Sequence, residues 1–184
     1  DVYKRQSQGR AQTKSAVSYK NPVVDIAMPD PTVIKAADGY FYVYATESTR
    51  NVPIMKSKDL VEWTYCNTAF TNKTRPRFEP KAGIWAPDIN YINGKYVLYY
   101  AMSVWGGEQT CGIGVATANS PQGPFTDHGK MFRSNEIGVQ NSIDPSLLQY
   151  EGRNYLVWGS FRGIYVIELT ADGLSICLLY TSDA

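Results

Sequence analysis

The chain has 184 residues, 43% of them apolar, and a formal net charge of +1. This size and composition can bury an ordinary globular core. The near-neutral charge, without a basic or acidic run, argues against nucleic acid or an anionic membrane as partner, and no apolar run approaches the roughly 18 residues that span a bilayer. Aromatic residues make up 13% of the chain, which favours β-strands and also suits a surface that stacks on sugar rings.

The two ends of the chain have an unusual relationship. Codons can be written for residues 1–6 whose reverse complement overlaps almost completely with codons for residues 177–182. This inverted repeat resembles the transposon end used in sequencing adapters. We therefore interpret residues 1–6 and 177–184 as translated adapter, and we expect the chain to be a fragment of a longer protein. Residues 7–20 are polar and without periodicity, so we expect a leader or linker there.

Three segments then repeat one order of features: an aspartate beside a proline, an apolar strand, a turn with glycine, and an aromatic strand. Their aspartates are Asp30, Asp88 and Asp144, spaced by 58 and 56 residues. In the first segment, strands over residues 32–35 and 40–46 flank an Asp-Gly turn, which is typical of a hairpin. A repeat of this length, made of strands and turns, is typical of a β-propeller.

The repeats predict an all-β chain with about three propeller blades and no amphipathic helix. We expect the blades at about residues 21–80, 81–138 and 139–176, each with four short strands. Propellers need about four to eight blades to close a ring. Further blades are therefore expected in the parent protein.

The repeated aspartates suggest a site. In a propeller the first strand of each blade lines the central channel, so Asp30, Asp88 and Asp144 are predicted around one mouth. Neighbouring carboxylates have separated pKa values, as acid/base hydrolysis requires. Inverting glycosidases pair a carboxylate base with a carboxylic acid at roughly 6.5–9.5 Å. An Asp-Pro at a strand start is alternatively plain turn chemistry, but its recurrence favours the site.

Four motifs carry a resemblance to a known family. They are Met28-Pro-Asp-Pro-Thr-Val33, Trp85-Ala-Pro-Asp88, Asn141-Ser-Ile-Asp-Pro145 and Gly159-Ser-Phe161. Together they resemble glycoside hydrolase family 43. The resemblance implies a five-bladed β-propeller in the parent and inverting hydrolysis of arabinan, arabinosides or xylosides. The last two motifs resemble the arabinan endo-hydrolase branch most.

The same resemblance implies a role for individual residues. Asp30 matches the general base that activates water, and Asp144 matches the aspartate that tunes the pKa of the general acid. That acid is a glutamate on the next blade, so we expect this chain alone to be inactive. The residues expected to bind substrate are Trp85, Asp88, Asn141, Ser142, Ser160 and Phe161.

The remaining candidates carry less weight. Glu136 is close in sequence to Asp144 but outside the first-strand register, so we reject it as the acid, and we expect the other glutamates to be solvated. His128, the only histidine, lies in a predicted turn, which argues against a Ser–His–Asp triad and a metal site. We expect no required cofactor. Some relatives hold an ion on the channel axis, so a calcium ion is allowed in the full-length parent.

Alternatives stay open at this point. They are a xyloside-cleaving member of the same family, a retaining fructan or sucrose hydrolase, and a non-catalytic carbohydrate-binding propeller. The fructan class would have asparagine before the first Asp-Pro, where this chain has Pro29. The expected partner is an arabinose- or xylose-containing polysaccharide or oligosaccharide, and we expect a monomer without nucleic acid or a membrane-spanning segment. Such a polymeric substrate predicts a secreted or periplasmic enzyme.

Overall fold

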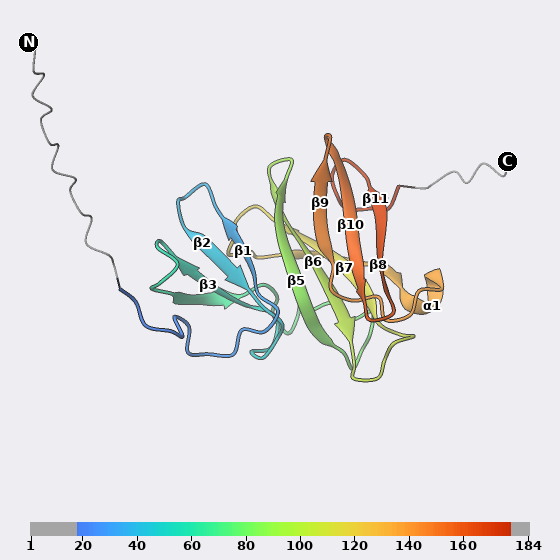
Figure 1. Ribbon diagram of the computed structural model, residues 1–184, viewed down its shortest axis with the longest axis horizontal. Coiled ribbons are helices and arrows are strands. Elements are labelled where there is room, and N and C mark those ends of the chain that lie inside the picture. The colour runs from blue at the N-terminus through green and yellow to red at the C-terminus, as the bar shows by residue number, and fades with distance from the viewer. Residues whose placement is uncertain (1–17, 178–184) are drawn as a thin grey trace, which may run out of the picture.

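The computed structural model describes residues 18–177. The adapter interpretation of residues 1–6 and 177–184 lies outside the described residues except at Cys177, whose backbone N–H donates to the carbonyl of Glu168 at 2.9 Å. Within them the chain is built from three antiparallel sheets arranged as neighbouring blades of a propeller (Figure 1). The predicted fold class is confirmed.

The first sheet has the order β1-β2-β3-β4. Its strands are β1 (Thr32–Lys35), β2 (Phe41–Tyr44), β3 (Pro53–Ser57) and β4 (Thr64–Thr68). The carboxylate of Asp38 accepts the backbone N–H of Tyr40 at 3.0 Å and so stabilises the turn between β1 and β2. The second strand, Phe41–Tyr44, is shorter than the predicted range 40–46.

The second sheet has the order β5-β6-β7-β8 and the third has β11-β10-β9. Their strands are β5 (Gly83–Ile92), β6 (Lys95–Ser103), β7 (Gly112–Ala118), β8 (Thr126–Arg133), β9 (Ser146–Tyr150), β10 (Arg153–Ser160) and β11 (Gly163–Leu169). The four-residue α1 (Ser134–Ile137) links the two sheets. The third sheet differs from the expected four strands: in the described range it has three, and a single bridge from Leu169 to Ile176 starts a fourth pairing.

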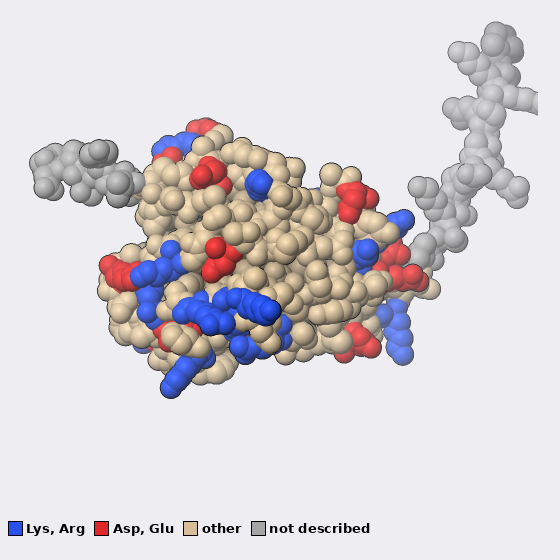
Figure 2. Space-filling model, turned by 180° about the vertical axis from the view of Figure 1, so that it is seen from behind, with Lys and Arg blue, Asp and Glu red and all other residues tan. Residues whose placement is uncertain are grey.

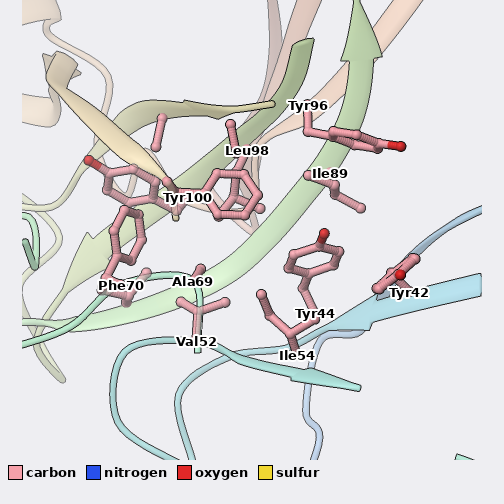
Figure 3. Close-up of a cluster of buried hydrophobic side chains, with 14 of the residues drawn as sticks. Tyr42, Tyr44, Val52, Ile54, Ala69, Phe70, Ile89, Tyr96, Leu98 and Tyr100 are labelled. Carbon is pink, nitrogen blue, oxygen red and sulfur yellow. The ribbon is translucent and has the colours of Figure 1, made fainter. Parts of the chain in front are cut away.

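Tyrosines and aliphatic side chains fill the space between the first two sheets. Figure 3 shows Tyr44 and Ile54 of the first blade facing Ile89 and Leu98 of the second. The Tyr44 hydroxyl donates to the carbonyl of Pro121, which satisfies its one polar group inside the core. Aromatic residues on strands therefore act mainly as core, with their hydroxyls paired as buried polar groups require.

A second core cluster joins the second and third sheets. Phe132 of β8 and Trp158 of β10 lie at its centre, with ring centroids 4.9 Å apart. Each blade thus packs on the next through its own apolar face. This stacking brings β5 into contact with β1 on one side and with β9 on the other.

The rear surface carries charges of both signs, with lysine and arginine gathered in one area beside acidic groups (Figure 2). Among the described helices, none has the length and apolar character needed to cross a membrane.

Candidate active site

The register of the three blades differs from the one that the sequence repeats suggested. Backbone pairing aligns Pro29 with Thr46 in the first blade and Ile143 with Gly159 in the third, each through an N–H···O bond of 2.9 Å. The matching pair in the second blade is Trp85 with Ala101. The next residue after the first member of each pair is Asp30, Ala86 or Asp144, and these three residues are therefore equivalent across the blades.

Ala86, and not Asp88, is the second-blade equivalent of Asp30 and Asp144. All three residues precede a proline and all three have a positive φ: 48°, 39° and 55° in chain order. Positive φ is uncommon for residues other than glycine, and a following proline normally favours extended backbone. The expectation of three aspartates in register is wrong, because Asp88 follows its proline whereas Asp30 and Asp144 precede theirs. The irregular pairing between Trp85 and Asp88 has the same length in all three blades, so Asp88 is equivalent to Thr32 and Ser146.

Asp30 lies two residues before β1, and its side chain contacts Thr46, two residues beyond the end of β2. The hydroxyl of Thr46 donates to Asp30 Oδ2 at 2.6 Å. The same hydroxyl accepts the backbone N–H of Ala86 at 2.7 Å. Asp30 is thus tied through one side chain to the start of the second blade.

Asp144 occupies the equivalent position on the third blade. Burial raises the pKa of its carboxyl above the ordinary value, and the nearby charge of Asp30 raises it further. The first and third blades therefore bring these two carboxyl groups into electrostatic contact. Interacting carboxyls are typical of hydrolytic sites, where one must hold a proton that the other does not.

A cavity of about 540 Å³ opens beside Asp144. Its wall includes five of the residues predicted for the site: Trp85, Asn141, Asp144, Ser160 and Phe161. The predicted residues that do not line it are Asp30, Asp88 and Ser142. A second hollow, of about 720 Å³, lies on the first blade, but its apolar lining contains no carboxylate. The smaller cavity is therefore the candidate site.

Asp88 lies deeper in the channel and connects all three blades. Its Oδ2 accepts the backbone N–H of Leu147 on β9 and the side-chain amide of Asn90, both at 2.7 Å. Its Oδ1 accepts the hydroxyl of Thr32 on β1 at 3.4 Å. Burial raises the pKa of Asp88, and these hydrogen bonds oppose the increase. In this geometry the carboxylate holds blades together.

The loop before Asp144 is held by a buried hydrogen-bond network. Asn141 donates from its side-chain amide to the hydroxyl of Ser160 at 2.8 Å, which fixes two cavity residues relative to each other. Ser142 is fully buried: its hydroxyl donates to the carbonyl of Val139 and accepts the indole N–H of Trp158 at 3.2 Å. Ser142 therefore supports the loop from behind the cavity.

Aromatic side chains form the rim of the cavity. Trp105 is 94% exposed and Phe161 is 79% exposed, whereas large apolar groups normally bury most of their area. Trp105 also contacts Trp85, with ring centroids 5.5 Å apart. Trp105 packs against this cavity residue and not in the core, which makes it a candidate site residue that the sequence pattern alone could not distinguish from packing.

The glutamates that we expected to be solvated are mostly paired. Glu47 and Arg75 form a buried ion pair that the sequence gave no means to predict, since its partners are far apart in the chain. Burial pushes the pKa of Glu47 upward, but hydrogen bonds from Arg75, Asn51 and Ile84 outweigh it and leave the pKa lowered. The hydrogen bond from Lys130 is the main cause that lowers the pKa of Glu136, which is the opposite of what a general acid requires.

A metal site was not expected, and the described residues offer no group of three or more His, Cys, Asp or Glu side chains that could hold an ion. His128 bonds instead to the hydroxyl of Thr117 at 2.8 Å, on the outer strands of the second blade.

Comparison with known proteins agrees with this geometry. Residues 19–177 match the family described as Glycosyl hydrolases family 43. The extracellular endo-alpha-(1->5)-L-arabinanase 1 of Bacillus subtilis (strain 168) is 38% identical over 149 residues, which cover 76% of this chain and 46% of that protein. The chain belongs to glycosyl hydrolase family 43, as its motifs suggested.

Solved structures show the same likeness. The native Bacillus subtilis arabinanase Arb43A superposes with a TM-score of 0.73 and 33% identity, covering 83% of this chain and 55% of that one. An exo-1,5-alpha-L-arabinanase from a bovine ruminal metagenomic library gives a TM-score of 0.71 and 29% identity, covering 87% and 56%. The chain spans about half the length of the curated relatives that it matches.

Proposed function

We propose that the protein to which this chain belongs is an inverting glycosidase that cleaves α-L-arabinosidic bonds in arabinan. One observation supports the proposal: Asp30 and Asp144 occupy equivalent backbone positions on two blades of a family 43 chain, and the charge of Asp30 contributes to the raised pKa of Asp144. Family membership argues against a retaining fructan hydrolase. The similarity to arabinanases favours arabinan over a xyloside.

In the proposed mechanism Asp30 is the general base that removes a proton from the attacking water. A glutamate on a further blade is the general acid that protonates the leaving oxygen. Asp144 is the residue that tunes this acid: when ionised, it places a negative charge near the glutamate, which disfavours loss of the glutamate's proton. The two catalytic carboxyls of such enzymes act on opposite sides of the sugar.

We place the cleaved sugar in the cavity of about 540 Å³ beside Asp144. The exposed faces of Trp105 and Phe161 supply apolar surface at its rim, and the amide of Asn141 and hydroxyl of Ser160 supply polar partners. A site with aromatic walls and few converging polar groups is typical of small-ligand pockets. The partner is therefore an arabino-oligosaccharide or polymer, and a polymer substrate implies action outside the cell. A channel-axis calcium ion stays a prediction for the complete enzyme.

The test is hydrolysis of linear arabinan and of xylan by the full-length enzyme, with product anomers followed by NMR. We expect arabinan cleavage with inversion, and a loss of about 10²–10⁴-fold in Asp30→Asn, the usual contribution of general acid–base catalysis. The 184-residue chain alone should lack this activity because it supplies no glutamate in the acid's position. Xylan cleavage in place of arabinan cleavage, or retention, would contradict the proposal.

A further inference from the structure

We propose that Thr46 is a positioning residue that orients the Asp30 carboxylate for activation of water. The inference rests on the proposed function, because it takes Asp30 as the general base. Thr46 follows β2 and lies at the junction of the first and second blades, where its hydroxyl makes two hydrogen bonds. The argument depends on the directions of those two bonds.

The backbone of the second blade determines where the hydroxyl proton of Thr46 points. The N–H of Ala86 can only donate, so in the 2.7 Å contact Thr46 Oγ1 must be the acceptor. A threonine hydroxyl has a single hydrogen. That hydrogen is therefore free to be donated to Asp30 Oδ2, 2.6 Å away.

This arrangement makes the two oxygens of Asp30 unequal. Oδ2 is occupied by the Thr46 hydroxyl, whereas Oδ1 has no hydrogen bond to any group in the described part of the chain. Oδ1 is consequently the oxygen left to accept a proton from water. Holding a base in one orientation in this way is a recognised contribution to rate, because small misplacements of reacting groups are costly.

Among the three blades that residues 18–177 form, the first alone has such a hydroxyl. The residues equivalent to Thr46 are Ala101 in the second blade and Gly159 in the third, as the backbone register shows. Neither has a side chain that can donate a hydrogen bond. The same backbone therefore gives Asp30 a fixed donor and gives Asp144 none, which matches the different roles proposed for them.

The residue after Thr46 holds this junction in place. The backbone N–H of Glu47 donates to the carbonyl of Ile84 at 3.1 Å, and a carboxylate oxygen of Glu47 accepts the N–H of Ile84 at 2.9 Å. Arg75 neutralises that carboxylate in a buried ion pair. The start of β5, and with it the N–H of Ala86, is thereby fixed relative to Thr46.

The experiment compares Thr46→Val, which keeps the shape and removes the hydroxyl, with Thr46→Ser, which keeps the hydroxyl. Both are made in the full-length enzyme, and kcat and KM are measured on an arabino-oligosaccharide. We expect Thr46→Val to lower kcat by about 30- to 100-fold, the scale of a misplaced catalytic group, with KM within about threefold. Thr46→Ser should restore kcat to within about threefold of the unmodified enzyme.

Thr126→Val is the matched control, because Thr126 is exposed at the start of β8 and its hydroxyl makes no hydrogen bond to other described residues. If Thr46→Val does not fold, Thr46→Ala provides the comparison. A kcat within threefold in the variant without the hydroxyl, or no recovery in Thr46→Ser, would overturn the inference. An unmodified enzyme inactive on arabinan would overturn the proposed function as well, whereas an active enzyme insensitive to Thr46→Val would overturn this inference alone.

Discussion

The carboxylate of Asp88 on the second blade accepts the backbone N–H of Leu147 on the third at 2.7 Å. Asp144 precedes Leu147 by three residues, so this bond fixes the start of the strand that carries the site. The sequence motif had suggested Asp88 as a substrate ligand. In the structure the carboxylate of Asp88 contacts all three blades. Its removal should therefore lower the free energy of unfolding.

We expect Asp88→Ala to destabilise the protein by about 2–3 kcal/mol, because it leaves the buried N–H of Leu147 without its charged acceptor. Asp88→Asn retains one carbonyl oxygen at the same place and should cost less than half as much. Urea unfolding followed by tryptophan fluorescence provides the comparison. Equal stability of the alanine variant and the unmodified protein would show that the link between the blades contributes little.

The interaction between Asp30 and Asp144 predicts a pKa change in a defined direction. Removing the charge of Asp30 with Asp30→Asn should lower the pKa of Asp144, yet leave it above 3.8, because burial is the larger cause of the increase. Carbon-detected NMR titration of the Asp144 carboxyl measures this. Asp25→Asn, a change at an exposed carboxyl, is the control and should leave the titration unaltered. An unchanged or higher pKa in Asp30→Asn would contradict the assigned proximity.

The buried ion pair of Glu47 and Arg75 predicts how stability depends on pH. Because the pKa of Glu47 is lower in the folded protein than its ordinary value of 4.5, its contribution is present above that value and is lost as pH falls through the folded pKa. Glu47→Gln should cost about 3 kcal/mol at neutral pH, since it leaves Arg75 buried without its counter-charge.

The loss caused by Glu47→Gln should shrink when the protein is measured in acid. Chemical unfolding at pH 7 and at pH values below 4.5 tests the sign directly. Glu136→Gln offers a control at an exposed pair with Lys130, where we expect little change in stability. If Glu47→Gln lowered the stability more in acid than at neutral pH, the assigned direction of the pKa shift of Glu47 would be wrong.

Trp105 should matter for binding and not for stability. Its side chain is 94% exposed at the cavity rim, so Trp105→Ala should change the free energy of unfolding by no more than about 0.5 kcal/mol. The KM for arabino-oligosaccharides should rise about tenfold, which corresponds to about 1.4 kcal/mol and lies just below the range for full burial of a large apolar side chain, because a sugar covers only one face of the indole.

Trp158→Ala provides the opposite pattern for comparison with Trp105→Ala. Trp158 is buried in the second core cluster, and its loss should destabilise the protein by about 3–5 kcal/mol. Denaturant unfolding and initial-rate kinetics on both variants make the comparison. Unaltered KM in Trp105→Ala would remove this residue from the binding surface.

Local sequence signals predicted much of the fold because each blade is assembled from short-range turns. The Asp-Gly turn after β1 and the spacing of the repeats depend on neighbouring residues, and both appear in the structure. The motifs around Asp30 and Asp144 identified the family for the same reason. Features set by contacts within a few residues are therefore the ones that a single sequence can supply.

Other features depend on contacts between distant segments, and the sequence pattern missed them. The register of Asp88 became clear only from the strand pairing, which aligns Ala86, and not Asp88, with Asp30 and Asp144. The pairing of Glu47 with Arg75 requires two loops to meet at a blade junction. Thr46 was overlooked because a hydroxyl next to a strand end has no distinctive pattern until its neighbour Asp30 is located in space.

The repeated positive φ at Asp30, Ala86 and Asp144 has a consequence for how this scaffold can change. These three positions are equivalent, and each has the same backbone conformation whichever side chain it carries. Two of them carry a carboxyl group and one carries a methyl group, so a repeated backbone gives a site without symmetry. New chemistry could thus arise in such a protein by substitution of one side chain at one of these positions, without a change in the surrounding strands.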